Sequence, residues 1–339
     1  MSRREFLKKT LLSVTGLPHL SFVEKTNDSS GISIIRPPKL KHGDIIGLVA
    51  PASAILKSDA IHNFQSFLEN AGFQVLKGKF LENQYGYLAG TDEERAADFN
   101  EMLRNEKVKA IIAMRGGWGC ARILPLIDYE AFQKYPKVIA GFSDITSLLL
   151  ALYAKTGVVT FHTSVGYSNW TDFTFHSFMQ IVAHKEKPKL KISRGNNQFY
   201  TITPGKAVGR LIGGNLAVLS GIVGSEYLPS FENAILFLEE INEEVYRIDR
   251  MLTHLKLAGI LSKINGFVFG HCEKCDPEEP EHSLSLQQVL EYHLKPLGIP
   301  AFYGAPFGHI PDKCTLPIGI SAEIYADKGV IKILDEAVT

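Results

Sequence analysis

The sequence has no excess charge of either sign, few cysteines and no long hydrophobic run. Its 36 Lys and Arg residues balance 36 Asp and Glu residues, so the formal net charge is zero. No dense Lys/Arg stripe follows residues 1–10, so nothing indicates a nucleic-acid partner. Four cysteines in 339 residues are too few for a disulfide scaffold. No repeat period or low-complexity tract indicates a solenoid or a disordered chain.

Residues 1–31 resemble a twin-arginine export signal. The string Arg3-Arg4-Glu5-Phe6-Leu7-Lys8 precedes a short apolar stretch over residues 11–23, which is too short to span a bilayer. The alternative is a basic amphipathic arm on a cytoplasmic protein, and the segment has no Ala-x-Ala cleavage site. We expect export, to the periplasm or beyond, and leave residues 1–31 out of the fold prediction.

What the sequence does contain is a globular composition in which strand-like and helix-like segments alternate. Hydrophobic residues make up 45% and charged residues 21%, and the length suits two domains. In the predicted first domain, residues 32–168, Thr91 and Glu94 form a capping box that predicts the start of a helix. The alternation predicts a parallel sheet covered by helices on both faces, in a flavodoxin-like or Rossmann-like arrangement. The predicted strands are residues 45–50, 73–76, 110–114, 138–140 and 158–161, and the predicted helices are residues 61–71, 91–103, 123–135 and 145–155.

The second half is less regular. Residues 169–203 show little pattern, and we predict that they cross from one domain to the other. Residues 204–339 predict a smaller, mixed α/β second domain whose topology the pattern does not determine. Its predicted strands are residues 209–213, 234–238, 266–269 and 329–334, with helices from residue 216 and over residues 246–257.

Ser143 lies where a predicted strand ends and the next helix begins. A serine at such a junction is pushed out of the sheet on a sharp turn, and the N–H groups that follow it can point toward a developing oxyanion. The alternative is that Ser143 or Asp144 only caps the helix. The string Gly141-Phe142-Ser143-Asp144 lacks the second glycine of the α/β-hydrolase elbow, so that family is not indicated.

A glycine-rich string, Arg115-Gly116-Gly117-Trp118-Gly119, follows the strand predicted over residues 110–114. In a parallel sheet this loop opens at the same carboxyl edge as Ser143, where ligands bind. Glycines there let backbone N–H groups approach a substrate and serve as a second oxyanion donor. The string is neither a dinucleotide-binding nor a Walker motif, so a phosphate cradle is not indicated; a purely structural turn stays open.

Three further features have no decisive spacing. Glu239 and Glu240 end the predicted strand at residues 234–238, and His309 lies in a loop rich in Gly and Pro. Such residues are also common as ordinary surface groups. Cys272 and Cys275, with His271 and His282 nearby, are compatible with a zinc site or, in an exported protein, with a disulfide.

Together, these strings resemble the LD-carboxypeptidases (muramoyltetrapeptide carboxypeptidases), serine peptidases that include the microcin C immunity proteins. The resemblance extends over residues 41–334. It rests on Gly90-Thr91-Asp92-Glu93-Glu94-Arg95, Arg115-Gly116-Gly117-Trp118-Gly119, Gly141-Phe142-Ser143-Asp144-Ile145-Thr146, Gly213-Gly214-Asn215-Leu216, Leu238-Glu239-Glu240-Ile241-Asn242-Glu243, Tyr246-Arg247-Ile248-Asp249-Arg250-Met251-Leu252 and Phe307-Gly308-His309.

The resemblance implies a role for each part of the site. Ser143 would be the nucleophile, His309 the general base and Glu239 the residue that orients the histidine. The implied oxyanion donors are the backbone N–H groups of Asp144 and of a glycine in the Arg115 loop. These candidate glycines are Gly116 and Gly117, and the candidate substrate contacts are Arg115, Trp118 and Asn215.

The implied activity is release of the terminal D-alanine from a cell-wall muropeptide tetrapeptide, through an acyl-enzyme on Ser143, in peptidoglycan recycling. No metal or organic cofactor is implied. Cleavage of acyl-aminoacyl adenylates and non-catalytic muropeptide binding are the alternatives, and a homodimer stays open. Thr163-Ser164 replaces a common Gly-Pro pair, Trp118 a common tyrosine and Glu240 a common aspartate, so substrate preference is the least determined feature.

Overall fold

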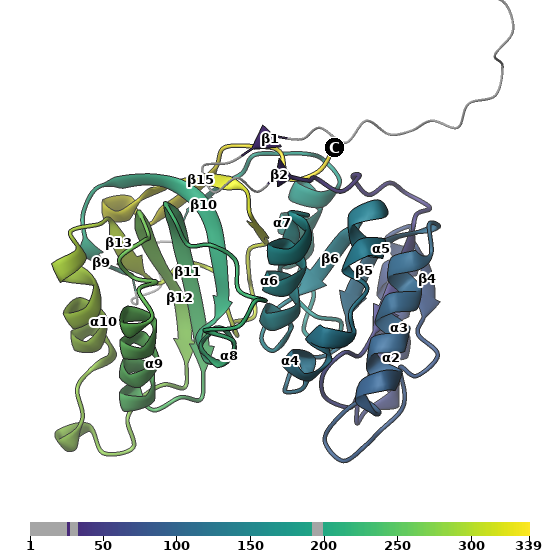
Figure 1. The fold of residues 1–339 in the computed structure, drawn as a ribbon, viewed down its shortest axis with the longest axis horizontal. Coiled ribbons are helices and arrows are strands. Elements are labelled where there is room, and N and C mark those ends of the chain that lie inside the picture. Colours follow the sequence, from purple (N-terminus) through teal and green to yellow (C-terminus); the bar gives the residue numbers. More distant parts are fainter. Residues whose placement is uncertain (1–25, 28–32, 192–198) are drawn as a thin grey trace, which may run out of the picture.

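The computed structural model describes residues 26–27, 33–191 and 199–339, which form two α/β lobes side by side (Figure 1). The predicted export signal lies outside the described residues except for β1 (Thr26–Asn27), which pairs with β2 (Ser33–Ile34). None of the described helices has the length and apolar character needed to cross a membrane.

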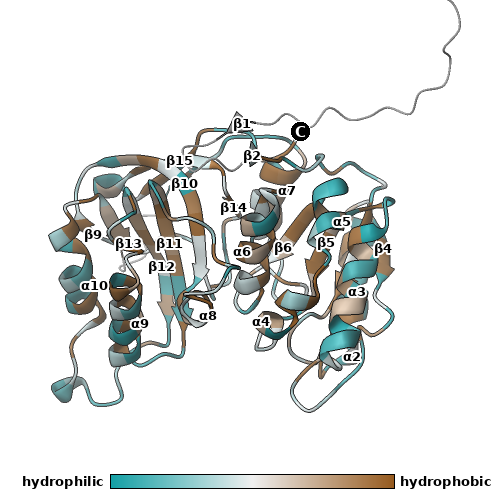
Figure 2. Ribbon diagram, viewed as in Figure 1, coloured by the Kyte–Doolittle hydropathy of each residue, from teal (hydrophilic) through white to brown (hydrophobic). Residues whose placement is uncertain are grey.

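The first lobe contains the predicted parallel sheet. Its strand order is β14-β7-β6-β5-β3-β4, and all neighbours run parallel except β14, which is antiparallel to β7. The bounds are β3 (Ile45–Val49), β4 (Gln74–Lys77), β5 (Val108–Ala113), β6 (Val138–Gly141), β7 (Thr160–His162) and β14 (Leu316–Ile318). Strands β5 and β6 are mostly hydrophobic (Figure 2) and, apart from Lys109 of β5, buried, as expected where helices cover both faces of a parallel sheet.

The helices of this lobe follow the predicted alternation with one correction. The capping box of Thr91 and Glu94 is confirmed. The single helix predicted over residues 123–135 is wrong: a 3₁₀ turn (Leu124–Leu126) separates two helices, because Pro125 has no N–H and Asp128 caps a new helix by accepting from Ala131 N–H. The helices are α2 (Ser58–Asn70), α3 (Asp92–Arg104), α4 (Cys120–Ile123), α5 (Tyr129–Lys134) and α6 (Ile145–Thr156).

The segment predicted to be an unpatterned crossover, residues 169–203, contains a helix, α7 (Asp172–Val182). Its buried face includes Thr174 and Ser177, whereas Phe173 is exposed. Polar residues inside and an aromatic residue outside hide the helical periodicity, which explains why the pattern missed this helix. Trp170, just before α7, packs with Phe64 of α2, so this part of the crossover belongs to the first lobe's core.

The second lobe combines strands and helices, as predicted for a mixed α/β domain, and its sheet contains both parallel and antiparallel pairs. Its strand order is β8-β16-β15-β10-β11-β12-β13-β9. The expectation of a smaller second domain is wrong for the sheet, which has eight strands, whereas the sheet of the first lobe has six. Within this sheet, only the four neighbouring strands β10 to β13 run parallel to one another. The strands are β8 (Lys189–Lys191), β9 (Tyr200–Thr203), β10 (Lys206–Asn215), β11 (Ala234–Ile241), β12 (Gly266–Glu273), β13 (Ala301–Tyr303), β15 (Ser321–Tyr325) and β16 (Val330–Ile333), with helices α8 (Leu216–Gly221), α9 (Val245–Leu257) and α10 (Leu286–Leu294).

The two lobes are tied together by the chain itself. β13 belongs to the second sheet and β14 to the first, so residues 304–315 cross from one lobe to the other. Hydrogen bonds reinforce the junction: Asn215 N–H donates to Thr146 Oγ1 at 3.0 Å, and Arg210 Nη1 donates to the Tyr153 hydroxyl at 3.0 Å. His309 lies on this crossing segment, which positions it near the first sheet.

Candidate active site

Ser143 occupies a sharp, left-handed turn between β6 and α6. Its φ of +61° is uncommon for a residue other than glycine and costs roughly 1–2 kcal/mol. The capping alternative is wrong for Asp144, whose side chain makes no cap hydrogen bond and instead accepts from Cys120 N–H at 2.8 Å. Burial raises the pKa of Asp144, and the hydrogen bond from Cys120 opposes that rise. The turn therefore holds Ser143 clear of the helix, and the Asp144 side chain fastens the turn to the loop that ends at Cys120.

That neighbouring loop is the glycine-rich string, and it packs directly on the serine. A Cβ atom built on Gly116 would lie 2.9 Å from Ser143 Cβ and 3.1 Å from Ser143 Oγ, so only glycine fits. Ser53 Oγ accepts from Trp118 N–H at 3.1 Å, and Arg115 donates to the carbonyl oxygen of Ala54. The two motifs that the sequence placed at one sheet edge are thus in contact.

Unpaired backbone amides surround Ser143. Within the described part of the chain, the N–H groups of Asp144, Gly116 and Gly117 donate to no other residue. A Cβ atom on Gly116 would lie 3.4 Å from Asp144 N, so the two loops approach each other closely. Asp144 and Gly116 are buried, and buried N–H groups in proteins rarely lack an acceptor. These amides can therefore bind an oxygen atom of a ligand.

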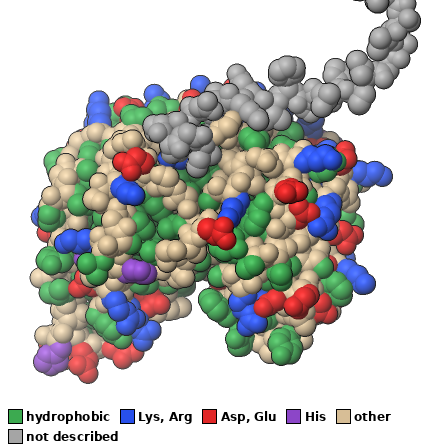
Figure 3. All heavy atoms as spheres, viewed as in Figure 1, with side chains coloured by type: hydrophobic (Ala, Val, Ile, Leu, Met, Phe, Trp, Pro, Cys, Tyr) green, Lys and Arg blue, Asp and Glu red, His purple; other side chains and the backbone are tan. Residues whose placement is uncertain are grey.

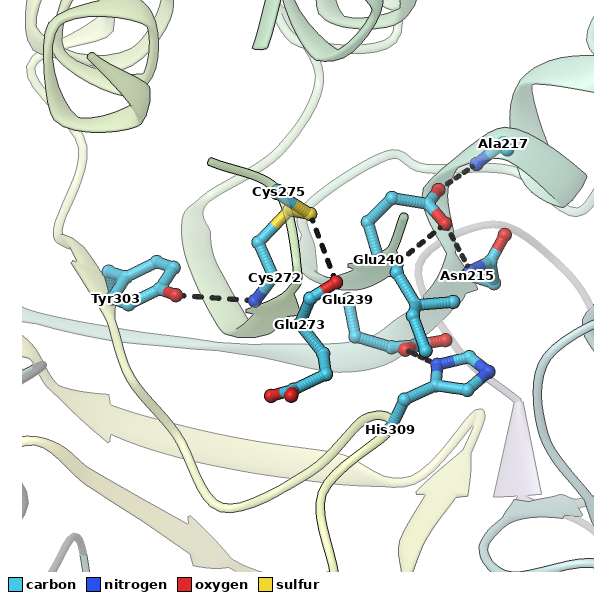
Figure 4. Close-up of a disulfide and its surroundings, with 10 residues drawn as sticks. Asn215, Ala217, Glu239, Glu240, Cys272, Glu273, Cys275, Tyr303 and His309 are labelled. Atoms are coloured by element: carbon cyan, nitrogen blue, oxygen red, sulfur yellow. Dashed lines mark hydrogen bonds and ion pairs between the residues drawn. A yellow bond between two sulfur atoms is a disulfide. The ribbon is translucent and has the colours of Figure 1, made fainter. Parts of the chain in front are cut away.

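Glu239 and His309 form a hydrogen-bonded pair beside this turn (Figure 4). His309 Nδ1 lies 2.7 Å from Glu239 Oε2. The Glu239 side chain is fully buried, and that of His309 is 17% exposed. The centroid of the His309 ring lies 4.7 Å from that of Phe142, the residue before Ser143. The pair is thus held next to the nucleophile turn by residues from both lobes.

A cavity of about 340 Å³ lies between the lobes, with Ser143 in its wall. Trp118 and Asn215 line it, together with Glu240 and the first turn of α8, whereas His309 is not part of its lining. Arg115 also lies elsewhere, with its guanidinium 5.6 Å from the centre of the Tyr167 ring. Figure 3 shows a notch between the lobes on the side where α4 and α8 approach each other in Figure 1.

Comparison with known proteins assigns the chain to a family. Residues 46–163 match the model of the LD-carboxypeptidase N-terminal domain, and residues 208–324 match that of the LD-carboxypeptidase C-terminal domain. Together these stretches cover more than half of the chain. The protein belongs to the LD-carboxypeptidase family. The first matched stretch contains Ser143, and the second contains Glu239 and His309.

Individual relatives agree with this assignment. The probable murein peptide carboxypeptidase of Bacillus subtilis is 39% identical over 292 residues, which cover 85% of this chain and 90% of the relative. The structure of a microcin C7 self-immunity protein in complex with aspartyl sulfamoyl adenosine has 30% identity and a TM-score of 0.81, and the match covers 90% and 99% of the two chains. The muramoyltetrapeptide carboxypeptidase of Oxalobacter formigenes has 29% identity and a TM-score of 0.77, with 87% and 100% covered.

Two titratable residues of this LD-carboxypeptidase site were missed by the sequence analysis. His162, on β7, packs edge-on against Phe142, Phe237 and Phe307, and burial lowers its pKa to about 4. Lys313 has its ammonium group 5.0 Å from the centre of the Phe142 ring. Burial lowers the pKa of Lys313, and the carboxylates of Glu239 and Asp312 oppose that change. Neither residue stands in a recognisable local motif: His162 reaches the site from the end of β7, and Lys313 lies on the crossing segment after His309.

Cys272 and Cys275 form a disulfide at the end of β12, beside Glu240 of the neighbouring strand (Figure 4). The zinc alternative is therefore wrong, because both sulfur atoms are bonded to each other. Elsewhere in the described ranges, no group of three or more His, Cys, Asp or Glu side chains is arranged to hold a metal ion.

Proposed function

We propose that this member of the LD-carboxypeptidase family is a serine peptidase that releases the terminal D-alanine from murein tetrapeptides, with Ser143, His309 and Glu239 as its catalytic triad. The observation that carries the proposal is the buried Glu239–His309 pair at the strained Ser143 turn. The substrate class follows from the relatives named as murein peptide and muramoyltetrapeptide carboxypeptidases.

Each group has a distinct task in the proposed acylation step. With its proton on Nδ1, His309 donates a hydrogen bond to Glu239 Oε2 across the 2.7 Å contact, which leaves the Nε2 lone pair free to accept the Ser143 hydroxyl proton. Ser143 Oγ then attacks the carbonyl carbon of the L,D peptide bond. The resulting oxyanion is stabilised by the N–H groups of Asp144 and of Gly116 or Gly117. Glu239 stabilises the imidazolium, which protonates the leaving D-alanine amine as the bond breaks.

Deacylation reverses these roles. Water loses a proton to His309 Nε2 and attacks the ester carbonyl carbon of the acyl-enzyme. The ester bond breaks, His309 returns the proton to Ser143 Oγ, and the tripeptide leaves with a new carboxylate. All proton transfers pass through one imidazole, so the proposed reaction requires no cofactor.

Removal of the Ser143 hydroxyl tests this proposal. Wild-type protein incubated with a defined tetrapeptide should release one alanine, measured by mass spectrometry. Ser143→Ala should lose at least roughly 10³-fold in kcat, because no other group can form the ester. Its melting temperature should not fall, since the hydroxyl supports no helix cap. Ser262→Ala, at an exposed serine of the second lobe, is the matched control; equal turnover by Ser143→Ala would refute the assignment.

A second substrate class is the amide of aminoacyl nucleotides. It is favoured by the similarity to the self-immunity protein that binds aspartyl sulfamoyl adenosine and by Trp118, which lines the cavity and is 49% exposed. An exposed indole can stack on a nucleobase. The ratio of kcat/KM for the tetrapeptide to that for an aminoacyl-sulfamoyl adenosine separates the two classes.

A further inference from the structure

Glu240 directly follows Glu239, the proposed orienting residue, but its carboxylate contacts different groups. Its carboxylate is buried, with 2% of the residue exposed, and it accepts three hydrogen bonds (Figure 4). The donors are Asn215 Nδ2 at 2.8 Å, Ala217 N–H at 2.7 Å and Ile241 N–H at 2.9 Å. Two of these donors lie at the junction between β10 and α8, so Glu240 holds that junction against β11.

The same junction is bonded to the first lobe. Asn215 donates its backbone N–H to Thr146 Oγ1 of α6 at 3.0 Å, and its side-chain oxygen accepts from Val218 N–H at 3.1 Å. Thr146 lies three residues after Ser143 and itself donates to the Ser143 carbonyl oxygen at 2.9 Å. A continuous series of hydrogen bonds therefore connects the nucleophile turn to Glu240 through Asn215.

The residues in this series are also the wall of the cavity. Asn215, Ala217, Val218 and Glu240 line the same 340 Å³ space as Ser143. Burial, and then the negative charge of Glu239, raise the pKa of Glu240 to about 7, whereas the three donors favour its ionised form. If the acceptor were lost, the buried Asn215 amide and the partly buried Ala217 N–H would have no partner, which is costly. The wall would then shift while the Glu239–His309 bond stayed intact.

We propose that Glu240 is a positioning residue that acts through Asn215 and the first turn of α8 to hold the substrate-binding wall of the cavity. The inference rests on the proposed peptidase function and assigns Glu240 to substrate binding, as distinct from Glu239, which serves the base. Two adjacent carboxylates on one strand thus have separate partners and separate effects.

Kinetics of Glu240→Gln test this inference. The Gln amide N–H₂ must face at least one of the donors, so that one hydrogen bond to a charged acceptor is lost. We expect KM for the tetrapeptide to rise about tenfold or more while kcat changes less than about threefold. The rate of covalent labelling by a small fluorophosphonate should match that of wild type, since labelling needs only the triad. Glu243→Gln, at a partly exposed carboxylate just after the end of β11, is the matched control and should match wild type in every constant.

A double-mutant cycle shows whether Glu240 acts through Asn215. The fold-increase in KM caused by Glu240→Gln should be at least about three times smaller in an Asn215→Ala background than in the wild-type background. The inference would be overturned if the double variant's increase in KM equalled the product of the two single increases. An unchanged KM or a slower labelling rate in Glu240→Gln would also overturn it. If Glu240→Gln does not fold, Glu240→Asp carries the test: its shorter carboxylate keeps the charge but cannot reach all three donors, so KM must rise while the labelling rate stays unchanged. A wild type that releases no D-alanine refutes the proposed function instead, so the two failures are distinguishable.

Discussion

At the scale of single residues, the two histidines near Ser143 differ in burial and in their contacts. His309 is partly exposed and bonded to Glu239, so it can exchange a proton with a substrate. His162 is buried and packs among phenylalanine rings. Its Nδ1 atom has no hydrogen-bond partner within the described residues. Two histidines of one site therefore have opposite roles: one is a candidate base, and the other is a neutral packing group.

The low pKa of His162 predicts a loss of stability in acid. Folding lowers its pKa from the ordinary 6.5 to about 4, so between these pH values only the unfolded chain binds the proton. The free energy of unfolding should then fall as the pH drops from 6.5 to 4, by about 3 kcal/mol from this residue. His162→Phe should show a pH dependence that is shallower by that amount in urea titrations. His282→Gln, at an exposed histidine, should keep the wild-type slope; an unchanged slope in His162→Phe would contradict the account.

At the scale of elements, the strand–loop–helix junctions were the predictable part of the site. Apolar runs located β5 and β6, and the parallel alternation placed the loops after both strands at one edge of the sheet. Their contact through Gly116 follows from that geometry. Two helical features of the first lobe that the pattern missed, the break at residues 124–126 and α7, depend on Pro125 and on buried polar residues, which hydrophobic periodicity does not reveal.

Contact between the two loops makes Gly116 sensitive to a single added methyl group. Gly116 has no left-handed φ, so Gly116→Ala introduces no backbone strain and acts only through the new contact with Ser143. We expect kcat to fall about tenfold or more, because small displacements of a nucleophile are costly, and stability to fall by about 1–3 kcal/mol from overpacking. Steady-state kinetics and urea unfolding measure the two effects. Wild-type kcat in this variant would show that the loop does not support the serine.

At the scale of the whole molecule, the site depends on a connection that no local pattern shows. β14 comes from the end of the chain yet pairs with β7 in the first sheet, and the segment before it carries His309 into position. Strand pairing at such separation is a property of the complete fold, so only the family resemblance could nominate Glu239 and His309 from the sequence. The export signal and the homodimer stay predictions.

The central claim is that Ser143 is an activated nucleophile and that His309, on the segment that crosses between the lobes, is its general base. Peptide mapping after fluorophosphonate treatment tests it most directly. The account predicts a single adduct on Ser143, which forms at least roughly 10²-fold more slowly in His309→Ala because the general base is missing. An adduct on another residue, or no adduct in a protein that still cleaves the tetrapeptide, would contradict it.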